Sequence, residues 1–544
     1  MSGDAFNRNY SRKDFLKLGA VALGASYLYA CTNRTSNPIA VHTIGANSKT
    51  GHLLREKKFP APSRTIAIDT VIVGGGVSGL SAARYLKKNN FEDFVLLELD
   101  VDTGGNAKGG KNKISAYPYG AHYLSLPNEK FTDLIDFLAE HKIISGFDNN
   151  GLPVYDEYYL CGEPQERLYY KGIWQEGLPP KHGMSMEENA ELDRFIGITE
   201  QYRKETGTDG KPAFTIPAEW SSDDGRYLEL DELSMFDFLK KLQFKTDFLF
   251  WFVNYCCKDD FGCDLHTTSA WAGMHYFCSR NGKSANAHAY EQLTWPEGNY
   301  FLINALRKDI LKHIQTEQLV YNIIPHNEQW QCYVFDVKTN TCTLYVCKRV
   351  IMATPQFVNK RLLNFDHGLS FNEFNYYPWL VANVTIKDKK ELNGSNELAW
   401  DNVFYTSKSL GYVNACHQLT DRSQSKTVIT FYYNFSEKNA KAEREALYQQ
   451  KEDFWKKLII DDLKIAHPKI EEWIEEIELY TYGHGMISPT VGLRTSSNRK
   501  KLEEGLNHLY FVNSDVSGLS IFEEAFYRGI CASKKILEQH AQKS

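Results

Sequence analysis

The feature that most constrains this fold is a glycine-rich loop between a predicted strand and a predicted helix. Residues 70–73 form a β-branched run typical of a buried parallel strand, and residues 74–79 follow with the spacing GxGxxG. In this pattern Gly74 permits a tight turn, and Gly76 lets the backbone approach a pyrophosphate. Gly79 lets the next helix pack closely on the strand. The pattern predicts a Rossmann-type unit that binds a dinucleotide.

The residues after the loop complete this unit. Ser78 begins a predicted helix over residues 78–88, whose first N–H groups and dipole would face the phosphates. Residues 94–97 form a second predicted strand, and Glu98 follows it, where a carboxylate can bind an adenosine ribose hydroxyl. The unit alone does not distinguish FAD from NAD.

Several motifs resemble one known family. Residues 70–124 resemble the start of the FAD-dependent amine oxidase and protoporphyrinogen oxidase superfamily, including a Gly-Gly pair that ends at Gly105. Asn106 stands where the family usually has an arginine. The resemblance recurs in the same order at residues 294–299 and 350–355.

The carboxyl-terminal part resembles the family's second FAD segment. Residues 509–515 are predicted to form a strand that ends in an acid, Asp515, which matches the acid that binds the flavin ribityl chain or the pyrophosphate. Glu523 matches the first residue of the family's Glu-Gly-Ala, whereas Glu524 replaces its glycine. The resemblance implies that the cofactor is FAD. The residues expected to hold it are Gly74, Gly76, Ser78, Gly79, Glu98, Gly105, Asn106, Asp515 and Glu523.

The resemblance also implies the domain organisation. We expect an α/β fold, in which a Rossmann-type FAD-binding domain of the glutathione reductase type, amine oxidase subgroup, carries an inserted α+β substrate domain. The FAD-binding domain is expected to comprise residues 66–125, 294–365 and 478–544. The substrate domain is expected to comprise residues 126–293 and 366–477.

The amino terminus is predicted to be a targeting signal. Arg12 and Lys13 precede an apolar stretch over residues 18–30, which is the order of a signal peptide and is too short for a membrane span. It resembles a twin-arginine signal, with Lys13 in place of the second arginine. Residues 28–31 resemble a bacterial lipobox, in which Cys31 would be lipidated.

These features predict an exported bacterial protein, either periplasmic or tethered to a membrane by an amino-terminal lipid anchor. Residues 1–31 would form the signal peptide. Residues 32–65 are rich in Ser, Thr, Asn, Gly and Pro and predict a tether without chemistry. No later segment offers 18 uninterrupted apolar residues.

Composition narrows the class of partner. The formal net charge of -6 provides no basic field, which argues against a nucleic-acid partner and favours a small-molecule substrate. The eleven cysteines lack the paired CxxC spacing of structural zinc, so no metal site is expected.

Catalytic candidates come from residues beside the expected flavin. Residues 480–486 resemble an aromatic-Gly-His stretch that lies next to the flavin in relatives, which makes Tyr482 and His484 candidates for orienting the substrate. His122 follows Gly120 and is a third candidate. The sequence has no second GxGxxG unit for NAD(P)H, so oxygen, a quinone or another carrier would accept the electrons.

Three functions remain open at this point. The first is an amine-oxidase-like FAD-dependent oxidoreductase that transfers a hydride equivalent from a small substrate to flavin N5. The second is a flavin-dependent desaturase or isomerase of an apolar substrate on the same fold. The third is an exported flavin-binding protein without turnover, which the departures at Asn106 and Glu524 keep open.

Overall fold

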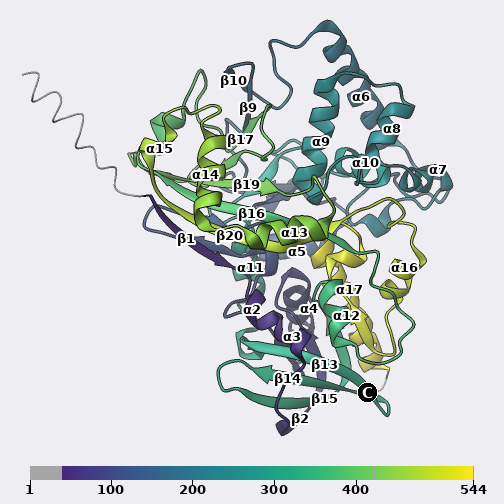
Figure 1. The fold of residues 1–544 in the computed structure, drawn as a ribbon. Coiled ribbons are helices and arrows are strands. Elements are labelled where there is room, and N and C mark those ends of the chain that lie inside the picture. The colour runs from purple at the N-terminus through teal and green to yellow at the C-terminus, as the bar shows by residue number, and fades with distance from the viewer. Residues whose placement is uncertain (1–38, 422, 543–544) are drawn as a thin grey trace, which may run out of the picture. The chain divides into compact units, whose positions relative to one another are not determined.

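The computed structural model describes residues 39–421 and 423–542 (Figure 1). Nearly all of the described residues belong to one compact unit that begins at Val41. The predicted signal peptide, including Arg12, Lys13 and Cys31, lies outside the described residues.

A seven-stranded sheet carries the glycine-rich loop. Its strand β2 (Pro62–Val73) runs parallel to β3 (Phe94–Leu97) on one side and to β15 (Thr341–Met352) on the other. Val71 and Ile72 are fully buried, as the β-branched run predicts for a strand covered on both faces. The remaining strands are β12 (Ile314–Gln315), β13 (Gln318–His326), β14 (Gln329–Asp336) and β21 (Leu509–Phe511). The predicted α/β class with a Rossmann-type unit is confirmed.

Two helices far apart in the sequence pack against each other beside this sheet, α4 (Val77–Lys88) and α17 (Phe522–Ala541) (Figure 1). A Cβ atom on Gly529 would lie 2.2 Å from the carbonyl oxygen of Ser78, so a side chain there would force the helices apart. The Ser533 hydroxyl donates to the Ala82 carbonyl at 3.0 Å across the same contact. The packing places the carboxyl-terminal segment next to the glycine-rich loop.

An eight-stranded sheet forms the second layer, with the order β1-β20-β16-β19-β18-β17-β9-β10. Its central strand β16 (Asn375–Ile386) is antiparallel to both β19 (Thr427–Asn434) and β20 (Ile474–Ser488). Helix α13 (Ala440–Gln449) packs against β16 and β20. The other strands are β1 (Ala40–Gly45), β9 (Glu166–Tyr170), β10 (Ile173–Glu176), β17 (Asp401–Phe404) and β18 (Tyr412–Asn414).

A group of helices shares a hydrophobic core with this second sheet. It comprises α6 (Met186–Lys204), α8 (Met235–Lys241), α9 (Asp247–Phe261) and α10 (Ala270–Cys278). Helix α9 also contacts β20. Further helices are α5 (Thr132–Glu140), α11 (Tyr300–Arg307), α12 (Gln356–Leu362), α14 (Glu452–Leu463) and α16 (Ser497–Glu504).

The segment predicted as a tether, residues 32–65, is structured where it is described. It contains β1, the short helices α2 (Ser48–Gly51) and α3 (Leu53–Glu56), and the start of β2. Leu54 is buried in the core, and the Asn47 side chain caps α2 by accepting from the Thr50 N–H. The segment has few apolar residues of its own. Its structure depends on contacts with elements that are distant in the sequence, since α3 contacts α12 and β1 pairs with β20.

The predicted domain boundary at residue 478 falls inside a strand. Strand β20 pairs with β16 from the partners Ile474 and Ile386 to the partners Ser488 and Asn375. The whole strand therefore belongs to the second sheet, and the return to the Rossmann-type unit comes after it.

The described part of the chain has no helix that is long and apolar enough to cross a membrane. Within the same residues, no three His, Cys, Asp or Glu side chains come together as a metal site, and each described cysteine is unpaired.

Candidate functional site

A cavity of about 480 Å³ lies where the parallel strands β2 and β3 end and α4 begins. This is the edge at which a Rossmann-type unit binds its dinucleotide. Both sheets and the carboxyl-terminal segment contribute to its wall. Predicted cofactor residues in the wall are Gly74, Gly76, Ser78, Glu98, Gly105, Asn106 and Asp515.

The glycine-rich loop has the geometry that its spacing predicts. Gly74 has a φ of 106°, a conformation that other residues rarely adopt, and its N–H donates to the Leu97 carbonyl at 2.8 Å. A Cβ atom on Gly79 would lie 2.0 Å from the Gly74 carbonyl oxygen, so Gly79 is needed for the close approach of α4. A Cβ atom on Gly76 would meet no protein atom within 4 Å, because Gly76 faces the open cavity.

Glu98 holds the loop from the second strand. Its carboxylate accepts from the Gly75 N–H at 2.7 Å and from the Asp100 N–H at 2.9 Å. Burial raises the pKa of Glu98, and these contacts together with Lys108 oppose that shift. The carboxylate thus lies in the cavity wall in a fixed orientation, as binding of a ribose hydroxyl requires.

Asn106 connects the Gly-Gly loop to the second sheet. Its side-chain N–H donates to the carbonyl oxygen of Gly485 on β20. An asparagine cannot provide the positive charge of the arginine that the family usually has here. The cations in the cavity wall are instead Arg55 on α3 and Arg361 on α12. Arg55 and Arg361 form no ion pair within the described residues.

Asp515 is buried at the opposite wall. One of its carboxylate oxygens accepts from the Tyr376 hydroxyl and from the Gln356 N–H, the latter at 2.9 Å. Burial raises the pKa of Asp515 to about 6. Tyr376 lies on β16, so this contact also joins the two sheets.

A second, smaller cavity of about 120 Å³ adjoins the first. The two share a wall that includes Asn106, Asn299, Tyr482 and Phe522. Beyond this wall the smaller cavity is lined by His122, Asp259, Asp260, Arg280, Trp379, Tyr432 and Glu523. A ligand in the smaller cavity would therefore contact aromatic and charged side chains next to the dinucleotide.

The three predicted catalytic residues lie in different places. Tyr482 is in the shared wall, whereas His122 lines only the smaller cavity and stacks on Tyr432 with ring centroids 4.8 Å apart. His484 lines the larger cavity and stacks on Phe357 at 4.1 Å. Burial lowers the pKa of His122 to about 4. Burial and nearby arginines lower the pKa of His484 to about 3, so both histidines are neutral at pH 7.

The two glutamates at the start of α17 face different surroundings. Glu523 lines the smaller cavity and does not reach the larger one, where the sequence places it as a cofactor residue. Glu524 is fully buried elsewhere, and its carboxylate accepts from the Ala218 N–H at 2.5 Å. Successive helix residues point about 100° apart, which explains the separation. Glu524 thus anchors a loop of the inserted domain.

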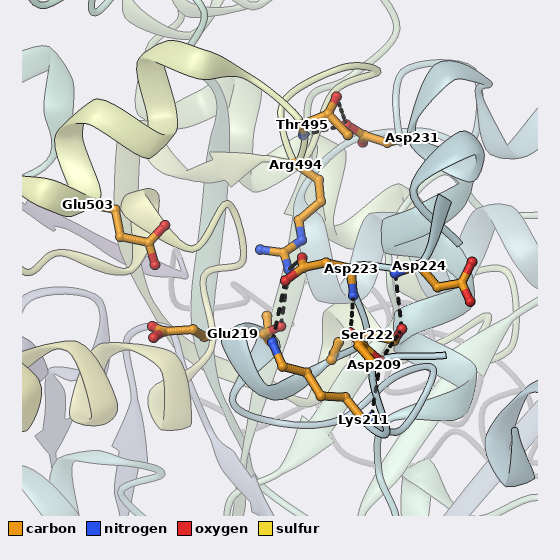
Figure 2. A network of polar contacts seen from close by, with 12 residues as sticks. Asp209, Lys211, Glu219, Ser222, Asp223, Asp224, Asp231, Arg494, Thr495 and Glu503 are labelled. Carbon is orange, nitrogen blue, oxygen red and sulfur yellow. Dashed lines mark hydrogen bonds and ion pairs between the residues drawn. The ribbon is translucent and has the colours of Figure 1, made fainter. Parts of the chain in front are cut away.

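A polar network next to Glu524 fastens the same inserted loop to the carboxyl-terminal part of the chain (Figure 2). Arg494 contacts Asp223 at 3.3 Å, and the Thr495 N–H donates to Asp231 at 2.9 Å. None of the network's labelled residues lines either cavity, and we assign it a structural role.

The sequence analysis missed the charged and aromatic residues of the smaller cavity. Asp259 and Asp260 lie in the last turn of helix α9, which is otherwise largely apolar. Two adjacent carboxylates in such a helix could have been recognised in the sequence as candidates for a functional site. Trp379 and Tyr432 lie on strands whose neighbours are equally aromatic, so no local pattern distinguishes them.

Comparisons with known proteins agree with this architecture. Residues 72–140 match the family described as an NAD(P)-binding Rossmann-like domain. No curated protein matches the sequence. Among solved structures, a putrescine oxidase bound to putrescine is similar, with 14% identity and a TM-score of 0.61 over 87% of this chain and 100% of that chain.

Two further solved structures are similar at 12% identity. A cyclohexylamine oxidase from Brevibacterium oxydans IH-35A has a TM-score of 0.63 over 87% of this chain and 99% of that chain. A fatty acid isomerase from P. acnes, described as producing CLA, has a TM-score of 0.60 over 86% of this chain and 98% of that chain. These likenesses show a shared fold.

Proposed function

We propose that this chain is an FAD-dependent oxidoreductase that oxidises a small amine at the carbon next to its nitrogen. The observation that carries the proposal is the pair of adjoining cavities. The larger one has the glycine-rich loop of a dinucleotide site, and the smaller one combines aromatic walls with carboxylates. Two of the similar solved structures are described as amine oxidases, which supports the same class of reaction.

The cavity residues fit FAD. The amino terminus of α4 at Gly76 and Ser78 would face the pyrophosphate, and Glu98 would bind the adenosine ribose. Asp515 would bind the ribityl chain or the pyrophosphate at the opposite wall. When bound, FAD supplies an acceptor for a hydride equivalent at flavin N5.

Cations from outside the Rossmann-type unit complete the phosphate site. Since Asn106 is uncharged, Arg55 and Arg361 provide the positive charge that a pyrophosphate requires. Arg55 belongs to the segment before β2, which also contacts Asp100 through the Asn47 N–H at 3.2 Å. The amino-terminal segment is thus part of the cofactor site.

The smaller cavity orients the amine and handles its proton. Tyr482 and Asn299 lie in the wall between the cavities and restrict the position of the reacting carbon. An amine loses a hydride only from its uncharged form, so a base must take the ammonium proton. Burial raises the pKa of Glu523 to about 7, and a carboxylate oxygen of Glu523 can accept this proton at neutral pH. Oxygen, a quinone or another carrier then accepts the electrons.

A second function, isomerisation or desaturation of an apolar substrate, is favoured by one comparison, the fatty acid isomerase. The carboxylates of the smaller cavity argue against it, because an apolar chain would leave them buried without compensation. Anaerobic reduction of the flavin by amines, described below, distinguishes the two functions, because isomerisation leaves the flavin oxidised overall.

We also propose that the protein is exported, on the evidence of its amino-terminal sequence. Changing Arg12 and Lys13 to Gln is expected to retain FAD-loaded protein in the cytoplasm. Unchanged export would contradict the twin-arginine route. A Cys31→Ala protein that still sediments with membranes after a salt wash would contradict lipidation.

The test of the proposed reaction is anaerobic mixing of FAD-loaded protein with primary amines, while the flavin absorbance is followed. Amines are expected to bleach the flavin, and polyunsaturated fatty acids are expected to leave it oxidised. If no amine reduces the flavin while dithionite does, amine oxidation is wrong, and isomerisation of an apolar substrate or a flavin-binding protein without turnover becomes the better account.

A further inference from the structure

The wall of the smaller cavity contains more carboxylate groups than cationic groups. The cavity is lined by three carboxylates, those of Asp259, Asp260 and Glu523, and by one cation, Arg280. Arg280 forms an ion pair with Asp260. The described residues provide no cationic partner for the other two carboxylates. If both are ionised, the cavity has two uncompensated negative charges.

Asp259 and Glu523 are both costly to keep charged. The Asp259 side chain forms no hydrogen bond or ion pair with any described residue. Burial and the nearby Asp260 raise its pKa to about 7, although the charge of Arg280 opposes this shift. Glu523 is 4% exposed, and its pKa is raised to about 7 as well. Uncompensated carboxylates destabilise a folded chain unless a ligand pairs with them.

A third acceptor in the cavity wall is also without a partner. Asn299 is 1% exposed, and its amide N–H donates to the Tyr123 carbonyl at 2.8 Å. Its amide oxygen is buried and accepts no hydrogen bond. The Asn299 amide oxygen thus adds an unused acceptor to the unpaired carboxylates, while the Trp379 indole N–H and the Tyr482 hydroxyl in the same wall are buried donors that also lack a partner among the described residues.

Aromatic rings add to the preference for a cation. Trp379 and Tyr432 line the same cavity. The Tyr432 hydroxyl is already used, because it donates to the Gly120 carbonyl at 2.9 Å, which leaves the ring as its binding surface. The face of an aromatic ring attracts an ammonium group.

The two uncompensated carboxylates come from different elements of the cavity wall, α9 and α17. Glu523 directly follows Phe522, which lines both cavities. Asp259 comes from α9 and lines only the smaller cavity, on the side of the inserted domain. A ligand that satisfies both carboxylates needs a positive group at each of two positions.

We propose that the smaller cavity binds a dicationic substrate, a short unbranched terminal diamine. Asp259 binds the distal ammonium, and the reacting amine lies by Glu523 and Asn299 next to the cofactor cavity. This inference rests on the proposed amine oxidation and assigns Asp259 as the residue that determines specificity.

The test compares two amines of equal chain length, n-butylamine and putrescine, on the FAD-loaded protein. Their dissociation constants are measured by anaerobic titration calorimetry, and the rate of flavin bleaching is measured separately. In the unchanged protein, putrescine is expected to bind about 10-fold to 150-fold more tightly, since a hydrogen bond between charged groups contributes about 1.5–3 kcal/mol. This comparison requires no variant.

Asp259→Asn is expected to remove that difference by weakening putrescine alone, with n-butylamine unchanged within about threefold. Asp247→Asn, at the exposed start of the same helix, is the matched control and should bind both amines as the unchanged protein does. Equal affinity for the two amines in the unchanged protein would overturn the inference, and so would equal weakening of both by Asp259→Asn. Preferential binding of putrescine without bleaching of the flavin would support the dication site and contradict the proposed oxidation. Equal affinities for the two amines, with equal bleaching of the flavin by both, would support the oxidation and contradict the dication site.

Discussion

The side chain of Asn106 donates a hydrogen bond to the carbonyl oxygen of Gly485, and both residues line both cavities. This contact joins the Rossmann-type unit to strand β20 of the second sheet at the wall that the two cavities share. A residue that the family resemblance marks as a departure is therefore a structural link between the two cavities.

Gly76→Asp is expected to abolish FAD binding in a folded protein. The new carboxylate would occupy the open space where the pyrophosphate lies and would repel it. FAD content after gel filtration checks this result. Gly197→Asp, at an exposed position of α6 where an added Cβ also meets no atom within 4 Å, should stay yellow. Normal FAD content in Gly76→Asp would remove the basis for the cofactor assignment.

The amino-terminal segment is expected to contribute to FAD affinity through Arg55. Arg55→Gln and Arg361→Gln should each weaken FAD binding about 10-fold, because each removes one positive charge from the cavity wall. The dissociation constant of FAD, measured by fluorescence quenching with the apoprotein, checks this effect. Lys58→Gln removes a charge from an exposed position next to α3 and should have no effect. Unchanged affinity in both arginine variants would place the pyrophosphate away from this segment.

Substitution of His122 is expected to slow flavin reduction, whereas substitution of His484 is expected to weaken FAD binding. His122→Ala should keep its FAD and reduce it about 100-fold more slowly, because hydride transfer depends on substrate alignment in the smaller cavity. His484→Ala should lose FAD affinity instead and reduce at the normal rate in its loaded fraction, since His484 lines the larger cavity and not the smaller one. Stopped-flow reduction and FAD titration measure the two effects. The opposite pattern would return His484 to the substrate site.

Asp259→Asn is expected to stabilise the amine-free protein at high pH. The pKa of Asp259 is about 7 in the folded state, above its ordinary value, so ionisation is opposed by folding. The cost is absent near pH 4, grows as the pH rises, and is complete above pH 7. The variant should therefore gain at least about 1 kcal/mol in the free energy of unfolding at pH 8 and almost nothing at pH 4. Denaturant unfolding at both pH values checks this, and an equal gain at both would contradict it.

The parts predicted from sequence are those whose residues are close together in the chain. The segment from β2 through α4 to β3 is one continuous βαβ unit, in which Gly74 lies in the connection after β2 and Glu98 directly follows β3. A local sequence pattern therefore identifies this part of the cofactor site. The position of Asp515 required the family resemblance, because its contact with Tyr376 spans 139 residues.

The parts that escaped prediction depend on distant partners. Arg55 lies in a polar segment that is ordered through contacts with α12 and β20. No periodicity in the local sequence predicts these contacts. Asp259 and Glu523 come from helices separated by almost half of the chain and meet only in the folded cavity.

Anaerobic reduction of the bound flavin by a small amine tests the central claim most directly. The account predicts that putrescine bleaches the visible absorbance of the FAD-loaded protein in a single turnover, and that admission of an electron acceptor restores it. Flavin that stays oxidised with putrescine and with monoamines, yet is reduced by dithionite, would contradict the claim that this chain is an amine-oxidising enzyme.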